Sequence, residues 1–177
     1  MTQTNRSHTA LGLVVAGALL RLMPHPPNVA PVGAMSLFAG ARLSGWQAYL
    51  APLLLMAVTD PIISAGMGYA AFSWRTPVVY FCFLISVWIG RGLRGTESPA
   101  RIGAAAFACA AQFYLITNLE SWWLSGMYPH SAAGLAACYI AALPFFGLTL
   151  IGNFAYSGLF FGAYHWLTRR EAASVVE

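Results

Sequence analysis

An acidic side chain stands inside an apolar stretch of this sequence, at Asp60, directly before Pro61. An ionisable group is costly to bury in a membrane, so such groups are functional candidates by default. Asp60 is therefore a candidate for binding a substrate, with Arg75 or the ligand itself as its partner. Two structural alternatives stay open, because Asp60 can cap a half-helix that begins after Pro61 or pair with Arg21.

A thiol stands in the next apolar stretch, at Cys82 in a Tyr-Phe-Cys-Phe run. It lies about one and a half turns, or roughly 9 Å, from the start of the apolar span Pro77–Leu93, a depth that suits a pocket floor. A thiolate is a soft ligand for late transition metals, and Arg75 or the helix N-terminus would favour the charged form. The alternative is a small buried packing residue, as most free cysteines are. Cys109 and Cys138 are expected to be such residues.

A third group of polar and aromatic side chains follows the fifth apolar span. It offers an amide, a carboxylate, several rings and an imidazole, and its members are Asn118, Glu120, Trp122, Trp123, Tyr128 and His130. Such a group can form a lid over a large ligand. The alternative is that Trp122 and Trp123 anchor a helix at the membrane interface, as such rings do in most membrane proteins. His25, which lies between two prolines, is a further binding candidate.

The sequence lacks the motifs of several common enzyme classes. No His-Glu-x-x-His cluster, no Gly-rich phosphate loop and no Gly-x-Ser-x-Gly elbow occurs. Ordinary hydrolase, kinase and ATPase chemistry therefore lacks its parts, and energy for transport would come from elsewhere. No run of basic residues interleaved with aromatics occurs either, so the net charge of +4 does not indicate nucleic-acid binding.

The composition is that of an integral membrane protein. Hydrophobic residues make up 59% of the 177 residues and charged residues only 8%, and the mean hydropathy is +0.65. One soluble core cannot hide so much apolar surface, so a lipid bilayer must cover much of it. We expect an all-α bundle of about six transmembrane helices that forms a single domain over residues 1–177.

Six apolar spans, bounded by Pro, Gly and Arg, are the expected helices: His8–Met23, Val29–Leu43, Trp46–Gly66, Pro77–Leu93, Arg101–Leu119 and Phe145–Leu167. The second span is short for a full crossing. A further piece, Ala132–Leu143, is cut off from the last span by Pro144, and we expect it to lie at the surface or to enter the membrane partway. The first span lacks a small-residue cleavage site, so we expect a retained helix rather than a signal peptide.

The arginines predict the orientation of the bundle. With six crossings, one side of the membrane receives Arg6, Arg42, Arg91, Arg94, Arg101, Arg169 and Arg170. The positive-inside rule makes this side the cytoplasm, so we expect both termini there and a location in the bacterial inner membrane. The opposite side then holds the loops Met23–Asn28, Gly66–Thr76 and Leu119–Ser131, which carry most of the candidate residues. No inverted repeat is visible, which counts against transporters built from paired halves.

Several short motifs occur together along nearly the whole chain. They are Arg21-Leu22-Met23-Pro24-His25-Pro26-Pro27-Asn28, Pro31-Val32-Gly33-Ala34, Thr59-Asp60, Met127-Tyr128-Pro129-His130, Pro144-Phe145-Phe146 and Gly152-Asn153. Together they resemble small membrane proteins related to the substrate-binding S components of energy-coupling-factor (ECF) transporters. Within that group, the Tyr-Phe-Cys-Phe run is similar to the solitary BtuM-type proteins implicated in vitamin B12 (cobalamin) uptake.

The resemblance implies a six-helix S-component fold with an outward pocket for cobalamin and with Cys82 facing the corrin cobalt. Cobalt–thiolate ligation agrees with the soft-ligand argument, and the thiolate would displace an upper ligand such as cyanide. One feature departs from the group. S components commonly dock on their membrane partner through Ala-x-x-x-Ala on the first helix, which Gly12, Ala16 and Ala18 do not reproduce. Dependence on an ECF energising module is therefore in doubt.

The sequence leaves three hypotheses open. The first is a cobalamin uptake protein in which Cys82 ligates cobalt and the substrate-binding residues are His25, Asp60, Arg75, Tyr80, Asn118, Tyr128 and His130. The second is an S-component-like binder of another small metabolite, in which Cys82 only packs and Asp60 with Arg75 recognises polar groups. The third is a membrane enzyme with Cys82 as nucleophile, which requires His25 or Asp60 to fold across as a general base.

Overall fold

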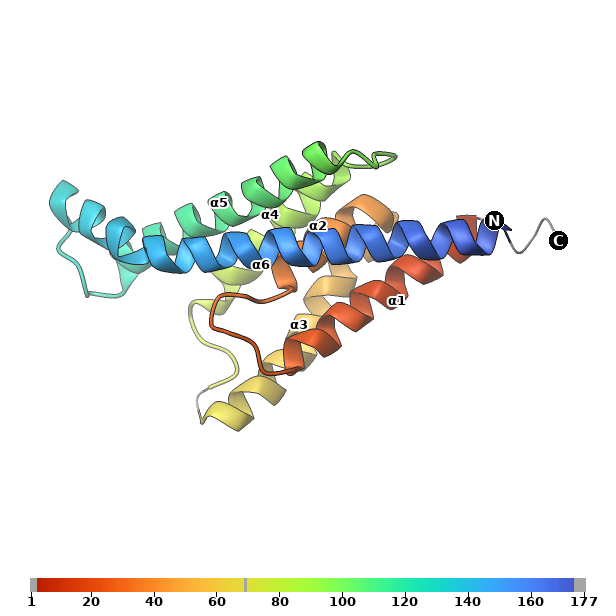
Figure 1. Cartoon of the computed structure of the whole chain (residues 1–177). Helices are drawn as coiled ribbons and strands as arrows, with labels where there is room; N and C mark the ends of the chain where they lie inside the picture. Colours follow the sequence, from red (N-terminus) through yellow and green to blue (C-terminus); the bar gives the residue numbers. More distant parts are fainter. Residues whose placement is uncertain (1–2, 69, 174–177) are drawn as a thin grey trace.

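The structure, a computed structural model, describes residues 3–68 and 70–173, and this part of the chain is all-helical. Its helices are α1 (Gln3–Leu22), α2 (Val32–Arg42), α3 (Gln47–Met67), α4 (Thr76–Arg91), α5 (Pro99–Leu124) and α6 (Ala132–Ala173). Figure 1 shows them as one bundle in which the start of α1 and the end of α6 lie at the same end. The prediction of an all-α protein is confirmed.

Helix α2 forms the centre of the bundle. It contacts each of the other five helices, and Leu37, Phe38 and Ala39 are 0% exposed. Phe38 packs edge-on against the rings of Phe161 and Tyr164 in α6, at centroid distances of 5.2 and 5.6 Å. A helix of 11 residues spans only about 16 Å. The short second span is therefore a core helix that the longer helices surround.

Two glycines set the position of α4 against α2. A β-carbon at Gly40 would lie 2.0 Å from the carbonyl oxygen of Val87, and one at Gly90 would lie 2.1 Å from that of Leu37. Only glycine permits this close approach of two backbones. The crossing holds the buried face of α4, which includes Cys82 and Val87, against the centre of the bundle.

The predicted separation of Ala132–Leu143 from the last span is wrong. Helix α6 runs without interruption from Ala132 to Ala173 and contains Pro144. A proline removes one helical hydrogen bond and displaces the carbonyl four residues earlier, which bends a helix more readily than it ends one inside a membrane. Figure 1 shows the first turns of α6 inclined to the rest of it. At 42 residues the helix is about 63 Å long, about twice the thickness of a bilayer core.

Helix α5 holds these first turns of α6 in place. The Tyr114 hydroxyl donates to the carbonyl oxygen of Tyr139 at 2.6 Å, and the Tyr139 hydroxyl donates to that of Leu115 at 2.7 Å. The Cys138 thiol donates to the carbonyl oxygen of Asn118 at 3.4 Å. Packing of Cys138 between two helices agrees with its expected role.

Helix α5 is also longer than predicted, because it ends at Leu124 rather than Leu119. Glu120 and Trp122 therefore lie on the last turns of a helix, as Asn118 does, rather than in the predicted loop Leu119–Ser131. The predicted end of this helix was wrong because the polar side chains near it form hydrogen bonds within the helix or to neighbouring residues. Asn118, for example, donates its amide to the carbonyl oxygen of Tyr114 at 2.8 Å.

Three of the described helices are long and apolar enough to cross a membrane: Gln47–Met67, Pro99–Leu124 and Ala132–Arg170. Helix α4 is apolar but shorter. Large apolar side chains cover the outside of the bundle, and Leu54, Val58 and Ile62 on α3 are each more than half exposed. An apolar outer surface of this extent belongs in lipid. Length and surface together indicate a membrane location.

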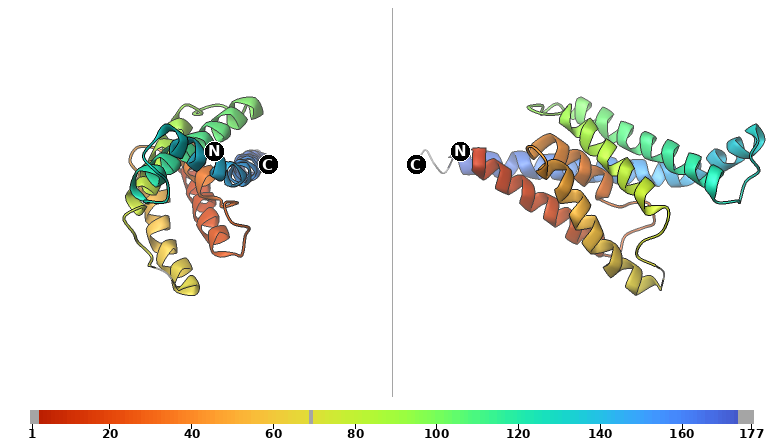
Figure 2. Two further views of the ribbon diagram at one scale, coloured as in Figure 1. Left: turned by 90° about the vertical axis from the view of Figure 1, so that its left-hand side faces the viewer. Right: turned by 180° about the vertical axis from the view of Figure 1, so that it is seen from behind.

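The loops after α2 and α4 lie toward the end of the bundle where α1 begins and α6 ends (Figures 1 and 2). Arg42 donates to the carbonyl oxygens of Leu93 at 3.3 Å and Thr96 at 2.7 Å. Arg94 donates to the carbonyl oxygen of Leu43 at 3.1 Å. These bonds tie the loop after α2 to the loop after α4, so the arginines satisfy backbone groups at the helix ends.

Candidate functional site

A cavity of about 190 Å³ lies inside the bundle. All six helices and the loop between α1 and α2 contribute to its wall. The polar residues on the wall are Arg21, Asn28, Asp60, Ser86, Thr149 and Asn153. The rest of the wall is largely apolar and includes Met56, Phe83 and Phe113. An apolar cavity with a few converging polar groups is the usual form of a small-molecule site.

An ion pair between Arg21 and Asp60 stands on this wall. Nη2 of Arg21 lies 2.5 Å from Oδ1 of Asp60, and the two side chains are only 16% and 14% exposed. Arg21 also donates to the hydroxyl of Thr59 at 2.5 Å, and the Tyr80 hydroxyl donates to Oδ2 of Asp60 at 2.6 Å. Residues from α1, α3 and α4 thus hold one largely buried carboxylate between a cation and a phenol.

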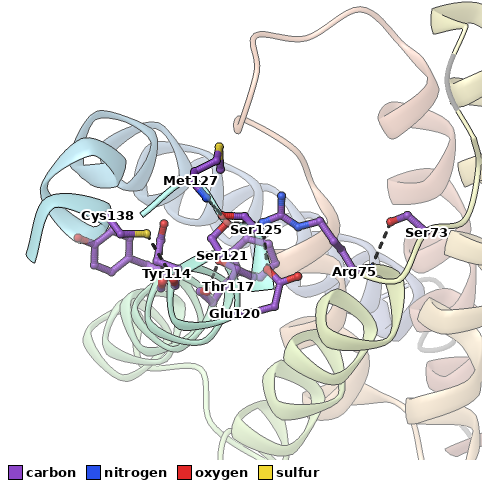
Figure 3. Close-up of polar contacts among 11 residues, drawn as sticks. Ser73, Arg75, Tyr114, Thr117, Glu120, Ser121, Ser125, Met127 and Cys138 are labelled. Atoms are coloured by element: carbon purple, nitrogen blue, oxygen red, sulfur yellow. Dashed lines mark hydrogen bonds and ion pairs between the residues drawn. The ribbon is translucent and has the colours of Figure 1, made fainter. Parts of the chain in front are cut away.

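The partner of Asp60 is therefore Arg21, one of the alternatives that the sequence left open. The alternative that Asp60 caps a half-helix is wrong, because α3 continues through Pro61 to Met67. Arg75 as its partner is also wrong. Arg75 lies directly before α4 and donates instead to Glu120 at 3.0 Å and to Ser121 at 2.5 Å, both on the last turns of α5. Figure 3 shows this second cluster.

Asn153 was missed as a binding candidate. Its amide donates to the carbonyl oxygen of Ala106 in α5 at 3.3 Å, and its side chain is on the cavity wall. A β-carbon at Gly33 would lie 2.4 Å from Oδ1 of Asn153, so a larger residue at this point of α2 would displace the amide. The available signal was a carboxamide in the middle of the most apolar span, since such residues are rare and usually find polar partners.

Cys82 is fully buried beside the cavity and is not among its wall residues. Its neighbours Phe83 and Ser86 line the cavity. The backbone carbonyl of Cys82 accepts hydrogen bonds from Ser86 at 3.2 Å and from the amide of Gln112 at 2.9 Å. Cys109, which was expected only to pack, is buried in the core and also lines the cavity.

The aromatic and polar group at the end of α5 lies away from the cavity wall. The His130 ring stacks on Trp123 at a centroid distance of 5.0 Å and hydrogen-bonds the Trp123 carbonyl oxygen at 3.1 Å. The Trp122 indole donates to the carbonyl oxygen of Pro129 at 3.0 Å. These contacts close the turn between α5 and α6. Tyr128 lies in the same turn, half-buried.

Of the predicted binding residues, Asp60 lines the cavity, and Tyr80, which is not a wall residue, is joined to it through its hydrogen bond to Asp60. Arg75, Asn118 and His130 form contacts among the helix ends instead. His25 lies in the loop between α1 and α2, and its buried Nε2 has no hydrogen-bond partner among the described residues. Across the described residues, no three His, Cys, Asp or Glu side chains are grouped to hold a metal ion.

The fold and the cavity define a class: a helical membrane protein with an internal polar site. The chain belongs to the family described as "Family of unknown function (DUF6580)", which it matches over residues 1–175. No curated protein and no solved structure matches the chain.

Proposed function

We propose that this protein is a substrate-binding and uptake protein of the bacterial inner membrane, similar to S components, that binds a small polar metabolite in its central cavity. The observation that carries this proposal is the buried Arg21–Asp60 pair on the cavity wall. Replacing a buried ion pair by well-packed apolar residues is often neutral or stabilising, so folding alone gives little reason to keep one. Binding of a ligand by the two charged groups does give such a reason.

The wall also indicates the chemical class of the metabolite. The guanidinium of Arg21 can bind a carboxylate, and Asp60 with the Tyr80 hydroxyl can bind an ammonium or hydroxyl group. A volume of about 190 Å³ is below the roughly 300–1,000 Å³ of pockets that hold drug-sized ligands. The favoured ligand is therefore a zwitterion of amino-acid size.

Cobalamin is the second candidate substrate. Two features support it: the similarity of the Tyr-Phe-Cys-Phe run to BtuM-type proteins, and a free thiol at Cys82 next to the wall residue Phe83. In the chemical step, the Cys82 thiolate would form a cobalt–sulfur bond while cyanide leaves as an anion, so the cobalt keeps its oxidation state. A corrinoid, however, is far larger than the cavity, so the helices would have to part and the thiol would have to turn onto the wall.

Uptake into proteoliposomes tests the proposal. The probes are the proteinogenic amino acids, each radiolabelled, and cyanocobalamin. We expect wild-type protein to accumulate at least one amino acid, and we expect Asp60→Asn to abolish this accumulation. Glu120→Gln, which alters the Arg75–Glu120 pair, is the matched control and should retain this accumulation. Accumulation of cyanocobalamin alone, lost in Cys82→Ala, would replace the zwitterion by the second candidate.

A further inference from the structure

The central cavity has a second set of polar wall residues, away from the Arg21–Asp60 pair. Ser86 of α4 with Thr149 and Asn153 of α6 form this set, which we call the second wall. Helix α3, which carries Asp60, contacts neither α5 nor α6 within the described residues. Figures 1 and 2 show α1 and α3 on one side of the bundle and α5 on the other. A molecule bound at the charged pair can therefore extend across the cavity to the second wall.

The carboxamide of Asn153 presents a free oxygen on this wall. Asn153 is only 4% exposed, and its Nδ2 donates to the carbonyl oxygen of Ala106 at 3.3 Å. Gly33 of α2 lies against Oδ1, since a β-carbon there would be 2.4 Å from this atom. Oδ1 has no hydrogen-bond partner in the described part of the chain, and it is not enclosed as Oε1 of Gln112 is. Because Asn153 is a wall residue, a molecule in the cavity can reach this oxygen.

The two hydroxyl groups of the second wall also act as acceptors toward the cavity. The Thr149 hydroxyl donates its hydrogen to the carbonyl oxygen of Phe145 at 3.0 Å, and the Ser86 hydroxyl donates its own to that of Cys82 at 3.2 Å. A hydroxyl oxygen that has given its hydrogen can still accept one. A buried acceptor that meets no donor costs free energy. The second wall therefore favours a ligand that brings a hydrogen-bond donor over one of the same shape without it.

We propose that the second wall selects amino acids whose aliphatic side chain carries a hydroxyl or carboxamide group: serine, threonine, asparagine and glutamine. This inference rests on the proposed function, since it takes the Arg21–Asp60 pair to bind the carboxylate and ammonium groups of the ligand. Oδ1 of Asn153 accepts the hydrogen bond from the ligand side chain, so Asn153 is a specificity-determining residue. Lysine and arginine also bring donors, but the second wall has no carboxylate to balance their charge.

The test compares threonine with valine, which has nearly the same shape and lacks the hydroxyl group. By calorimetry on the full chain in detergent micelles, we expect the wild type to bind threonine about tenfold more tightly than valine. Asn153→Ala should lose this preference. Asn118→Ala is the matched control, because Asn118 also donates its amide to a helix carbonyl but does not line the cavity, and it should keep the preference.

A second variant displaces the oxygen without removing it. Gly33→Ala places a methyl group against Oδ1 of Asn153, so the carboxamide must turn, and the preference for threonine should fall as well. Equal affinity of the wild type for threonine and valine, or a preference that both variants retain, would overturn this inference and leave the zwitterion site standing. A wild type that binds no amino acid would overturn the proposed function and this inference together.

Discussion

The pairs Arg21–Asp60 and Arg75–Glu120 are alike in chemistry and differ in position. In the first, both side chains are largely buried, at 16% and 14% exposure, and Asp60 also accepts a hydrogen bond from Tyr80. In the second, Arg75 is 43% exposed while Glu120 is 7% exposed. The first pair lines the central cavity, whereas the second joins the start of α4 to the last turn of α5.

The difference separates a pair that the fold explains from one that it does not. Arg75 and Glu120 connect two helix ends: the Arg75 side chain is 43% exposed, whereas Glu120 is 7% exposed and its Oε1 has no hydrogen-bond partner in the described part of the chain. Arg21 and Asp60 bury both charges beside open space, where an apolar pair would serve the fold as well. We therefore assign ligand binding to the first pair and a structural role to the second.

The largest effect is expected from breaking the buried pair on one side. Asp60→Ala leaves the Arg21 guanidinium buried without its partner, which should lower the free energy of unfolding by about 3 kcal/mol. The measurement is unfolding in mixed detergent micelles. The double variant Arg21→Met with Asp60→Leu should recover most of this stability and still bind no amino acid. If the double variant also binds, the pair does not contact the ligand.

A smaller effect is expected from Tyr80→Phe, which removes the hydroxyl that donates to Asp60. A hydrogen bond to a charged group contributes about 1.5 kcal/mol, so stability should fall by that amount. The affinity for the amino acid that most raises the unfolding temperature of the wild type should fall about fivefold, which corresponds to about 1 kcal/mol. Unchanged affinity measured by calorimetry would remove Tyr80 from the site.

The second pair should be less sensitive. Glu120→Gln keeps an acceptor for Arg75, whose guanidinium is partly in water, so the free energy of unfolding should fall by only about 1 kcal/mol. Amino-acid uptake should stay at the wild-type level. Loss of uptake in this variant, at normal protein yield, would contradict the assignment of a structural role to the Arg75–Glu120 pair.

The smallest effect is expected at Cys82. Cys82→Ala removes one buried sulfur atom, and we expect a loss of roughly 0.5 kcal/mol, at the lower end of what deleting a buried group costs. Amino-acid binding should not change, because Cys82 is not on the cavity wall. A corrin absorption spectrum that is shifted in the wild type and lost in Cys82→Ala would instead support cobalt–thiolate binding.

Much of the fold could be predicted from the sequence, because each apolar span forms its own helix with all backbone groups satisfied internally. The errors lie where tertiary contacts decide. Pro144 did not end α6, since hydrogen bonds from Tyr114 and Tyr139 hold its first turns to α5. The polar residues around Glu120 did not end α5, since Arg75, which lies directly before α4, binds them.

The site was predicted less well than the fold, since a cavity lined by six helices has no local signature. Asp60 was found because a carboxylate in an apolar span is conspicuous. Its partner was wrongly expected to be Arg75, although Arg21 had been one of the open alternatives. Which arginine reaches Asp60 depends on how α1 packs against α3, and this packing cannot be deduced from the sequence of either helix. Asn153 was missed for the same reason.

The most direct test of the central claim is a thermal-unfolding screen of purified protein against the proteinogenic amino acids and cyanocobalamin. Three proteins are compared: the wild type, Cys82→Ala, and the double variant Arg21→Met with Asp60→Leu. We expect an amino acid to raise the unfolding temperature of the wild type and of Cys82→Ala but not of the double variant. Stabilisation by cyanocobalamin that persists in the double variant and disappears in Cys82→Ala would contradict the assignment of the site to Arg21 and Asp60.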